Sequence, residues 1–173
     1  LEPGDTMDLL APLGNGFPLA QGAKCAAFVG GGIGTPPLLG AAAAFSGQKL
    51  AVLGFRSKDA VILEDDFRAA GCKTHVTTND GSYGTPGLVT AVLEQESFDV
   101  CYACGPAPML RAVAALCAAR GVPCFVSLEE RMACGVGACL GCAVALRHAD
   151  GTEYYGHVCK DGPVFCAQDV IFA

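Results

Sequence analysis

The chain of 173 residues is acidic and apolar, with a formal net charge of −6, 52% hydrophobic residues and only 16% charged residues. This composition indicates a well-buried globular protein of one domain or two small ones, and the negative charge argues against a nucleic-acid partner, because phosphate binding needs a basic surface. The sequence shows no signal peptide, apolar run of membrane length or basic amphipathic segment, so we expect no membrane attachment and a cytoplasmic location.

The first 22 residues do not look like a complete folding unit. They read as a turn, a strand over 6–10 and a glycine-rich loop with the letters LGNGF. A lone strand is not stable without sheet neighbours, and the chain begins at Leu1 rather than at a methionine. We therefore expect a fragment, or a processed piece, of a longer protein whose preceding domain ends in this segment.

From residue 24 onward, strand patterns alternate with helix patterns, which predicts a parallel sheet covered on both faces. The expected strands span 26–29, 49–55, 73–77, 98–103 and 122–127. The expected helices span 35 to about 45, 57–70, 86–96 and 106–119, with Ser57 or Asp59 as the N-cap of the second. The predicted fold class is α/β, with a parallel-sheet nucleotide domain over 23–128 and a small β-rich domain over 129–173.

Two loops follow strands of the predicted sheet and carry unusual residues. The loop GGGIGTPP at 30–37 opens a helix, where backbone N–H groups hold a pyrophosphate in many nucleotide sites. It departs from G-x-G-x-x-G, because the third glycine position falls on Thr35. The run CGPAPML at 104–110 ends another strand. Tight turns without a ligand are the alternative, but two such loops on one sheet edge favour a nucleotide site.

Near the C-terminus, Cys134, Cys139 and Cys142 have the C-x4-C-x2-C spacing of plant-type [2Fe–2S] sites, and Cys159 is a candidate fourth ligand. Small residues between these cysteines let backbone N–H groups approach the cluster sulfurs: they are Gly135, Gly137, Ala138 and Gly141. The sequence therefore predicts an electron-transfer protein. A structural zinc site and packed thiols are the alternatives, although zinc usually takes two C-x2-C pairs and only one is present.

The residues between the third and fourth cysteines predict a hairpin. Two short extended runs flank Asp150-Gly151, a dipeptide suited to a two-residue type I′ turn. With that turn, Cys142 lies directly opposite Cys159, with their Cβ atoms roughly 5 Å apart. The two thiols would then be close enough to bind one small cluster.

We interpret the remaining cysteines as packing residues on strands and helices, since buried free cysteine behaves as a small apolar side chain. They are Cys25, Cys72, Cys101, Cys117 and Cys124. Cys166 lies seven residues beyond Cys159, and we assign it to packing as well, because a [2Fe–2S] site needs no fifth thiol. His157, two residues before Cys159, is a candidate for hydrogen bonding near the cluster.

Taken in order, the runs GGGIGTPP, CGPAPM, ERMACGVGACLGC and VCKDGPVF resemble the electron-transfer subunits of two-subunit, NAD-linked dihydroorotate dehydrogenases, within the ferredoxin–NADP reductase-like superfamily. The resemblance extends from about Pro3 to Phe172. Such subunits have a flavin-binding barrel, a pyridine-nucleotide domain and a [2Fe–2S] domain, which implies that residues 1–22 are a barrel remnant and linker. The arginine-containing barrel motif that holds FAD has no counterpart here, so we expect this chain alone to lack FAD.

The resemblance implies cofactor-binding residues but no catalytic residue. It places the flavin near Leu13, Gly14, Asn15 and Gly16. It places the NAD pyrophosphate and the flavin edge along Gly31, Gly32, Ile33, Gly34 and Thr35. It places the nicotinamide beside Cys104, Gly105 and Pro106. Arg56 stands where the adenosine ribose is read. An arginine there hints at the 2′-phosphate of NADP, whereas the family uses NAD, and we expect NAD. The loop over 78–87 resembles one beside the nucleotide, or is a surface turn.

The resemblance also implies a function. Electrons would pass between NAD(H), FAD and the [2Fe–2S] cluster, and on to an FMN-containing catalytic subunit that oxidises dihydroorotate in pyrimidine biosynthesis, in a heterotetramer. The flavin is needed because a hydride carries two electrons and the cluster accepts one. Two alternatives remain: an iron–sulfur flavoprotein serving another partner, such as a sulfur or hydrogenase system, and a non-catalytic redox-sensing or metal-binding module.

Overall fold

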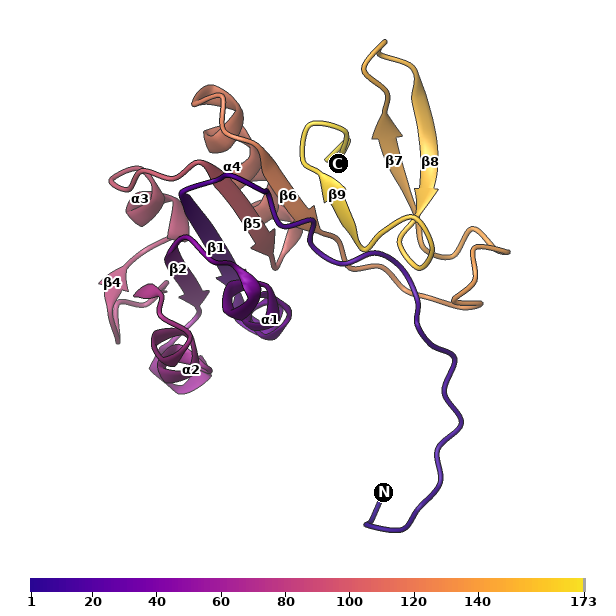
Figure 1. The fold of residues 1–173 in the computed structure, drawn as a ribbon, viewed down its shortest axis with the longest axis horizontal. Helices are drawn as coiled ribbons and strands as arrows, with labels where there is room; N and C mark the ends of the chain where they lie inside the picture. The colour runs from indigo at the N-terminus through magenta and orange to yellow at the C-terminus, as the bar shows by residue number, and fades with distance from the viewer. Residues whose placement is uncertain (173) are drawn as a thin grey trace.

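The computed structural model describes residues 1–172 and is built on a seven-stranded sheet in the order β4-β3-β2-β1-β5-β6-β9 (Figure 1). The strands are β1 Cys25–Gly31, β2 Gln48–Phe55, β3 Lys73–Thr78, β4 Thr85–Pro86, β5 Val100–Cys104, β6 Cys124–Ser127 and β9 Val164–Cys166. Neighbouring strands are parallel except at one edge, where β9 runs antiparallel to β6. The predicted α/β fold class is confirmed.

Helices cover both faces of this sheet. Successive residues of the central strand β1 point to opposite faces and nearly all are buried, so both faces need a covering layer. The helices are α1 Pro36–Ala44, α2 Glu64–Ala69, α3 Val89–Leu93 and α4 Ala107–Ala119. Phe28 of β1 packs in a core with side chains of α1 and α2, and its neighbour Val29 packs in a second core with side chains of α3 and α4. Two buried cores therefore fix the sheet edge from which the loops emerge.

Phe28 lies at the centre of the first core, is completely buried and stacks on Tyr102 with ring centroids 5.4 Å apart. We expect Phe28→Ala to lower the free energy of unfolding by about 3–5 kcal/mol, because it removes a large side chain from a site flanked by rigid strands. Urea unfolding followed by circular dichroism measures this loss. The same substitution at exposed Leu88 is the control and should change stability by less than about 1 kcal/mol.

Three predicted elements differ in this part of the structure. The helix expected over 86–96 forms only as α3, Val89–Leu93, because Pro86 belongs to strand β4 and Gly87 adopts a φ of 107°, outside the helical range. Residues 6–10 form no strand, and Met7, Leu9 and Leu10 are exposed, because no neighbouring strand pairs with them within residues 1–172. The helix expected over 57–70 is broken into a 3₁₀ turn, Lys58–Ala60, and α2, and neither Ser57 nor Asp59 caps it through its side chain. The break arises because Val61 is extended and Leu63 adopts a φ of 60°, which turns both side chains toward the first core.

A two-stranded sheet follows β6 and projects from the main sheet, with β7 at Ala143–Arg147 and β8 at Glu153–His157 (Figure 1). The predicted register of this hairpin is wrong by one residue. Ala143 pairs with His157, and the loop has three residues, 149–151. The type I′ turn fails because it needs positive φ at both central residues, and here only Gly151 has it, with φ 88°.

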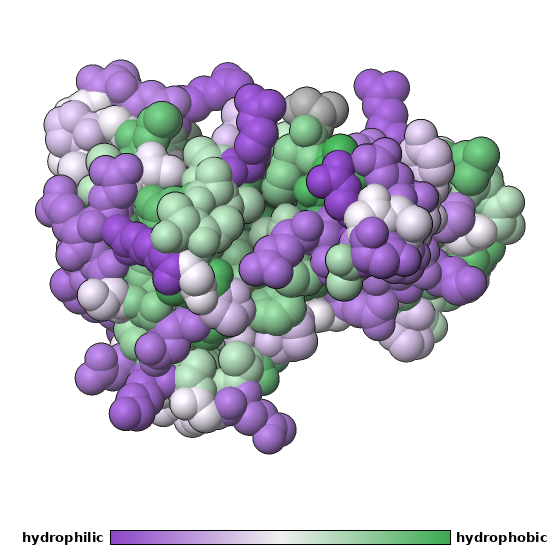
Figure 2. Space-filling model, turned by 90° about the horizontal axis from the view of Figure 1, so that it is seen from above, coloured by the Kyte–Doolittle hydropathy of each residue, from purple (hydrophilic) through white to green (hydrophobic). Residues whose placement is uncertain are grey.

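Within residues 1–172, no helix combines the length and apolar character needed to cross a membrane. Figure 2 shows hydrophilic residues spread over the face seen from above, with smaller apolar areas between them.

Candidate cluster site and nucleotide pocket

The four candidate cluster cysteines converge from three segments. Cys134 and Cys139 lie in the loop after β6, Cys142 directly precedes β7, and Cys159 lies in the turn after β8. Cys142 and Cys159 are 2% and 4% exposed and pack with Val158 in a small core. In the observed register Cys142 accepts a hydrogen bond from the Val158 N–H, and the turn that begins at residue 158 then brings the Cys159 thiol onto Cys142.

The thiols meet in two pairs. The Cys139 thiol lies close enough to Cys134 to lower its pKa. Burial and the nearby Cys142 thiol together raise the pKa of Cys159. A [2Fe–2S] cluster bound by four cysteines has two thiolates on each iron. The four residues therefore fit this cluster, with one thiol pair available for each iron.

Backbone N–H groups surround the thiols. The N–H of Val136, the thiol of Cys139 and the N–H groups of Cys139 and Ala138 lower the pKa of Cys134 to about 6. The Gly141 N–H donates to the Cys139 Sγ at 3.4 Å. The loop reaches this shape because Gly135 and Gly137 adopt φ of 72° and 76°, which only glycine adopts freely. Such inward N–H groups stabilise negative charge on sulfur and raise a cluster's reduction potential.

A cavity of about 340 Å³ opens at the carboxyl edge of β1, β2 and β5. Fourteen residues line it: Gly31, Gly32, Gly54, Phe55, Arg56, Thr77, Asn79, Leu88, Val89, Thr90, Pro106, Pro108, Met109 and Ala112. The carboxyl edge is where open parallel sheets bind ligands. The cavity therefore lies where the two predicted nucleotide loops should meet.

The glycines of the first loop differ in the space around them. A Cβ at Gly31 would lie 2.7 Å from the Met109 Sδ and 2.9 Å from the Pro106 Cδ, whereas a Cβ at Gly32 would meet nothing within 4 Å. Gly32 has φ of 54° and lines the cavity. The Thr77 hydroxyl on the cavity wall is buried without a hydrogen-bond partner. An open backbone and an unpartnered buried hydroxyl fit a polar ligand such as a dinucleotide.

The cavity contains only part of the predicted nucleotide set, namely Gly31, Gly32, Arg56 and Pro106. Ile33 is 79% exposed outside it, and Gly34 is packed so closely against Cys104 that a Cβ would lie 2.4 Å from the Cys104 carbonyl oxygen. Thr35 is buried and its hydroxyl has no partner. Cys104 and Gly105 adjoin the first loop without lining the cavity.

Sequence reasoning missed the apolar wall of the cavity. Met109 and Ala112 come from α4, and Leu88, Val89 and Thr90 come from the start of α3. The available signal was their position, since Met109 and Ala112 lie within or just after the 104–110 run and residues 88–90 directly follow the 78–87 loop. Asn79 does lie in the 78–87 loop that was considered beside the nucleotide.

The predicted flavin segment contacts the cluster domain instead of the cavity. A Cβ at Gly135 would lie 3.5 Å from Leu13 and 3.8 Å from Leu10. Asn15 pairs with Pro163 in an isolated bridge, and Figure 1 shows the N-terminal segment passing beside the loops that hold the cysteines.

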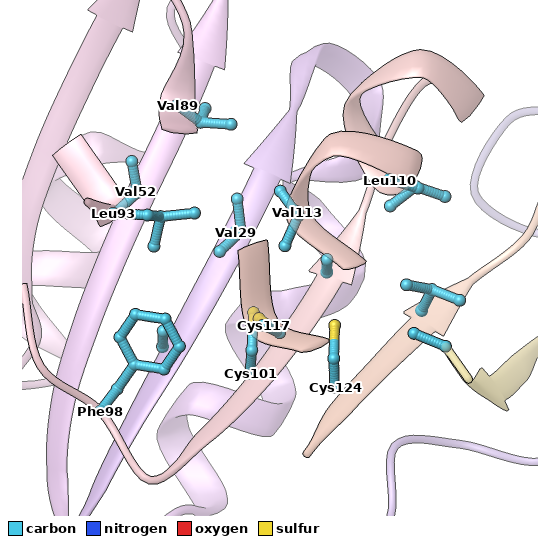
Figure 3. Packing of buried hydrophobic residues seen from close by; sticks show 14 of the residues in the cluster. Val29, Val52, Val89, Leu93, Phe98, Cys101, Leu110, Val113, Cys117 and Cys124 are labelled. Carbon is cyan, nitrogen blue, oxygen red and sulfur yellow. The ribbon is translucent and has the colours of Figure 1, made fainter. Parts of the chain in front are cut away.

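Three other cysteines also come together. The sulfurs of Cys101, Cys117 and Cys124 lie within 4.8 Å of one another in the core between α4 and the sheet (Figure 3). Hydrogen bonds to Cys117 and Cys124, together with complete burial, raise the pKa of Cys101. Hydrogen bonds from the other two thiols lower the pKa of Cys117 to about 4. All three side chains are buried among apolar residues of the core, and packing remains our interpretation of this trio. Cys72 is buried directly before β3 rather than on it, and Cys166 lies in β9.

Comparison with known proteins agrees with the cluster geometry. Residues 129–171 match a family model described as the iron-sulfur cluster binding domain of dihydroorotate dehydrogenase B. The chain is 54% identical to the dihydroorotate dehydrogenase B (NAD(+)), electron transfer subunit of Bacillus caldolyticus, covering 98% of this chain and 67% of that protein. The chain belongs to this electron transfer subunit family. The subunit of Caldanaerobacter subterraneus is 45% identical, covering 99% of this chain and 69% of its own length.

Solved structures of other proteins share the fold of this member of the dihydroorotate dehydrogenase B electron transfer subunit family. A structure of an NADH-dependent reduced ferredoxin-NADP oxidoreductase, described for flavin-based electron bifurcation, has a TM-score of 0.82 at 33% identity, over 99% of this chain and 62% of that one. The C-terminal domain of a Pyrococcus furiosus hydrogenase has a TM-score of 0.55 at 19% identity, which shows a shared fold only. The predicted family and the predicted iron–sulfur binding are confirmed.

Proposed function

We propose that this chain carries electrons between NAD(H), FAD and a [2Fe–2S] cluster, to or from an FMN-containing catalytic subunit that oxidises dihydroorotate. The observation that carries the proposal is the presence in one chain of two thiol pairs, Cys134 with Cys139 and Cys142 with Cys159, and of a cavity at the carboxyl edge of the parallel sheet. A catalytic partner subunit is implied by the name of the relatives as electron transfer subunits. We propose a heterotetramer for the assembly.

Each part of the chain has a separate task in this proposal. Gly31 and Gly32 leave room for a pyrophosphate, Arg56 binds the adenosine ribose or phosphate, and Pro106 borders the nicotinamide. Exposed Ile33 and the 13–16 segment face the flavin. When bound, the flavin supplies conversion between two-electron and one-electron chemistry.

The proposed parts are a flavin-side segment over 1–22, a nucleotide domain over 23–128 and a cluster domain over 129–173. Strand β9 lies within the residues of the cluster domain, but it pairs with β6 and so forms part of the sheet of the nucleotide domain. The cluster domain is thus joined to the nucleotide domain through a shared sheet edge, which supports a fixed distance between the two cofactors.

The proposal predicts the behaviour of the 173-residue chain on its own. The FAD contacts assigned to it are limited to exposed Ile33 and the exposed 13–16 segment, so we expect it to bind a cluster but retain no FAD. Without FAD, a hydride from NADH has no two-electron acceptor, because the cluster takes one electron. Turnover from NADH to ferricyanide should therefore be negligible.

The matched measurement uses the same chain extended by an upstream flavin domain of about 100 residues, the size of a small domain. Cofactor extraction and the ferricyanide assay should show FAD and NADH oxidation appearing together in the longer protein. Stoichiometric FAD with rapid NADH oxidation in the 173-residue chain would overturn the assigned division of tasks.

A further inference from the structure

The segment around Asn15 is hydrogen-bonded to the turn that carries Cys159, although the two are more than 140 positions apart in the sequence. The Asn15 side chain donates from Nδ2 to the carbonyl oxygens of Lys160 at 3.3 Å and Asp161 at 3.1 Å. The Asn15 backbone N–H donates to the carbonyl oxygen of Gly162. One residue therefore binds three successive carbonyl groups directly after the cysteine.

The turn is shaped so that these carbonyl groups are available. The His157 carbonyl oxygen accepts N–H groups from Lys160, Asp161 and Gly162 at 3.1, 2.8 and 3.2 Å, and the Asp161 carboxylate accepts the His157 N–H at 2.8 Å. The N–H groups of the turn are thus used internally. Its carbonyl oxygens point outward, where Asn15 supplies the donors.

The fit between the two segments depends on close backbone contact. Gly14 adopts φ of 66°, and a Cβ there would lie 2.3 Å from the Gly162 carbonyl oxygen and 2.9 Å from the Pro163 Cδ. On the other side, the Pro163 carbonyl oxygen accepts the Leu128 N–H at 2.9 Å, at the end of β6. The turn with Cys159 is therefore held between the N-terminal segment and the main sheet.

We propose that Asn15 is a positioning residue for the fourth cluster ligand. By binding the carbonyl groups of residues 160–162, it fixes the turn that presents the Cys159 thiol to Cys142. Asn15 also joins the turn with Cys159 to the 13–16 segment, so that the proposed flavin-binding segment and the cluster ligand move together. This inference rests on the proposed cluster function. It assigns to Asn15, which is not a cluster ligand, the role of holding a ligand in place.

The test compares Asn15→Leu with Gln21→Leu in cluster-loaded full chain. Both positions carry exposed amide side chains in the N-terminal segment, so both substitutions replace an exposed amide by the same apolar side chain. We expect Asn15→Leu to lose iron to a chelator roughly threefold to tenfold faster than wild type, the effect of losing about one net hydrogen bond. The g-values of the reduced cluster in electron paramagnetic resonance should also shift. Gln21→Leu should match wild type in both measurements.

A second substitution, at Gly14, disturbs the same turn through a steric clash instead of a lost hydrogen bond. Gly14→Ala should accelerate iron loss in the same direction, because its methyl group displaces the Gly162 carbonyl. Wild-type iron loss and g-values in both Asn15→Leu and Gly14→Ala, with circular dichroism confirming folded protein, would overturn the positioning role. Failure of the wild-type chain itself to bind iron would instead overturn the proposed function, and the positioning role with it.

Discussion

Replacing Cys142 or Cys159 by serine is expected to abolish the visible absorption of the anaerobically loaded chain. Each is one member of a buried thiol pair, and a hard hydroxyl does not replace a soft thiolate on iron. Losing one member leaves an iron with a single protein ligand on that side. Absorption spectra and iron analysis after anaerobic reconstitution measure the loss, and we expect less than about a tenth of the wild-type iron, in line with loss of a metal ligand.

Cys166→Ser is the matched control for these variants. Cys166 is likewise a cysteine near the C-terminus, but it is half-buried and lies in β9, where it pairs with Phe125 of β6. The Cys166→Ser variant should retain the full visible absorption spectrum of the wild-type chain. A bleached Cys166→Ser together with an intact Cys142→Ser would show that the ligand set has been assigned to the wrong cysteines.

The second large effect is expected at Gly32, where valine should weaken NADH binding by at least about tenfold, or about 1.4 kcal/mol. Gly32 lines the cavity and a Cβ there would meet no protein atom within 4 Å, so we expect the added side chain to occupy space assigned to the pyrophosphate. Strain at φ of 54° lowers the stability of the folded variant as well, so circular dichroism must first show that it is folded. Titration of NADH fluorescence measures the affinity.

Gly40→Val provides the control, because a Cβ at Gly40 also meets nothing within 4 Å but lies on α1, outside the cavity. We expect its NADH affinity to equal that of wild type. Equal affinity in wild type and Gly32→Val would mean that the nucleotide does not bind along this glycine loop.

The cluster site was predictable because its information is local. The spacing of Cys134, Cys139 and Cys142 within nine residues specifies a loop, and the Asp150-Gly151 turn signal returns the chain toward Cys159. The register was wrong because the same dipeptide suits loops of two and three residues. The Asp150 carboxylate accepts the N–H and hydroxyl of Thr152 at 2.9 and 2.6 Å, which stabilises the longer loop.

Contacts between distant segments were not predictable from the sequence. The sequence places Asn15 in a flavin loop, yet its observed hydrogen bonds are to Lys160 and Asp161. Likewise, the sulfurs of three cysteines meet because β5 lies next to β6 in the sheet and α4 packs against both: Cys101, Cys117 and Cys124. The order of strands in a sheet cannot be predicted from the hydrophobic periodicity of a single strand. The break before α2 reflects packing of Leu63 into the core, which overrides local helix preference.

The most direct test of the account is the metal content and electron paramagnetic resonance of the wild-type chain after anaerobic reconstitution and reduction. The two thiol pairs predict two irons and two sulfides per chain, with one unpaired electron per reduced cluster. A stoichiometric zinc ion with no iron, and no resonance after reduction, would contradict the account.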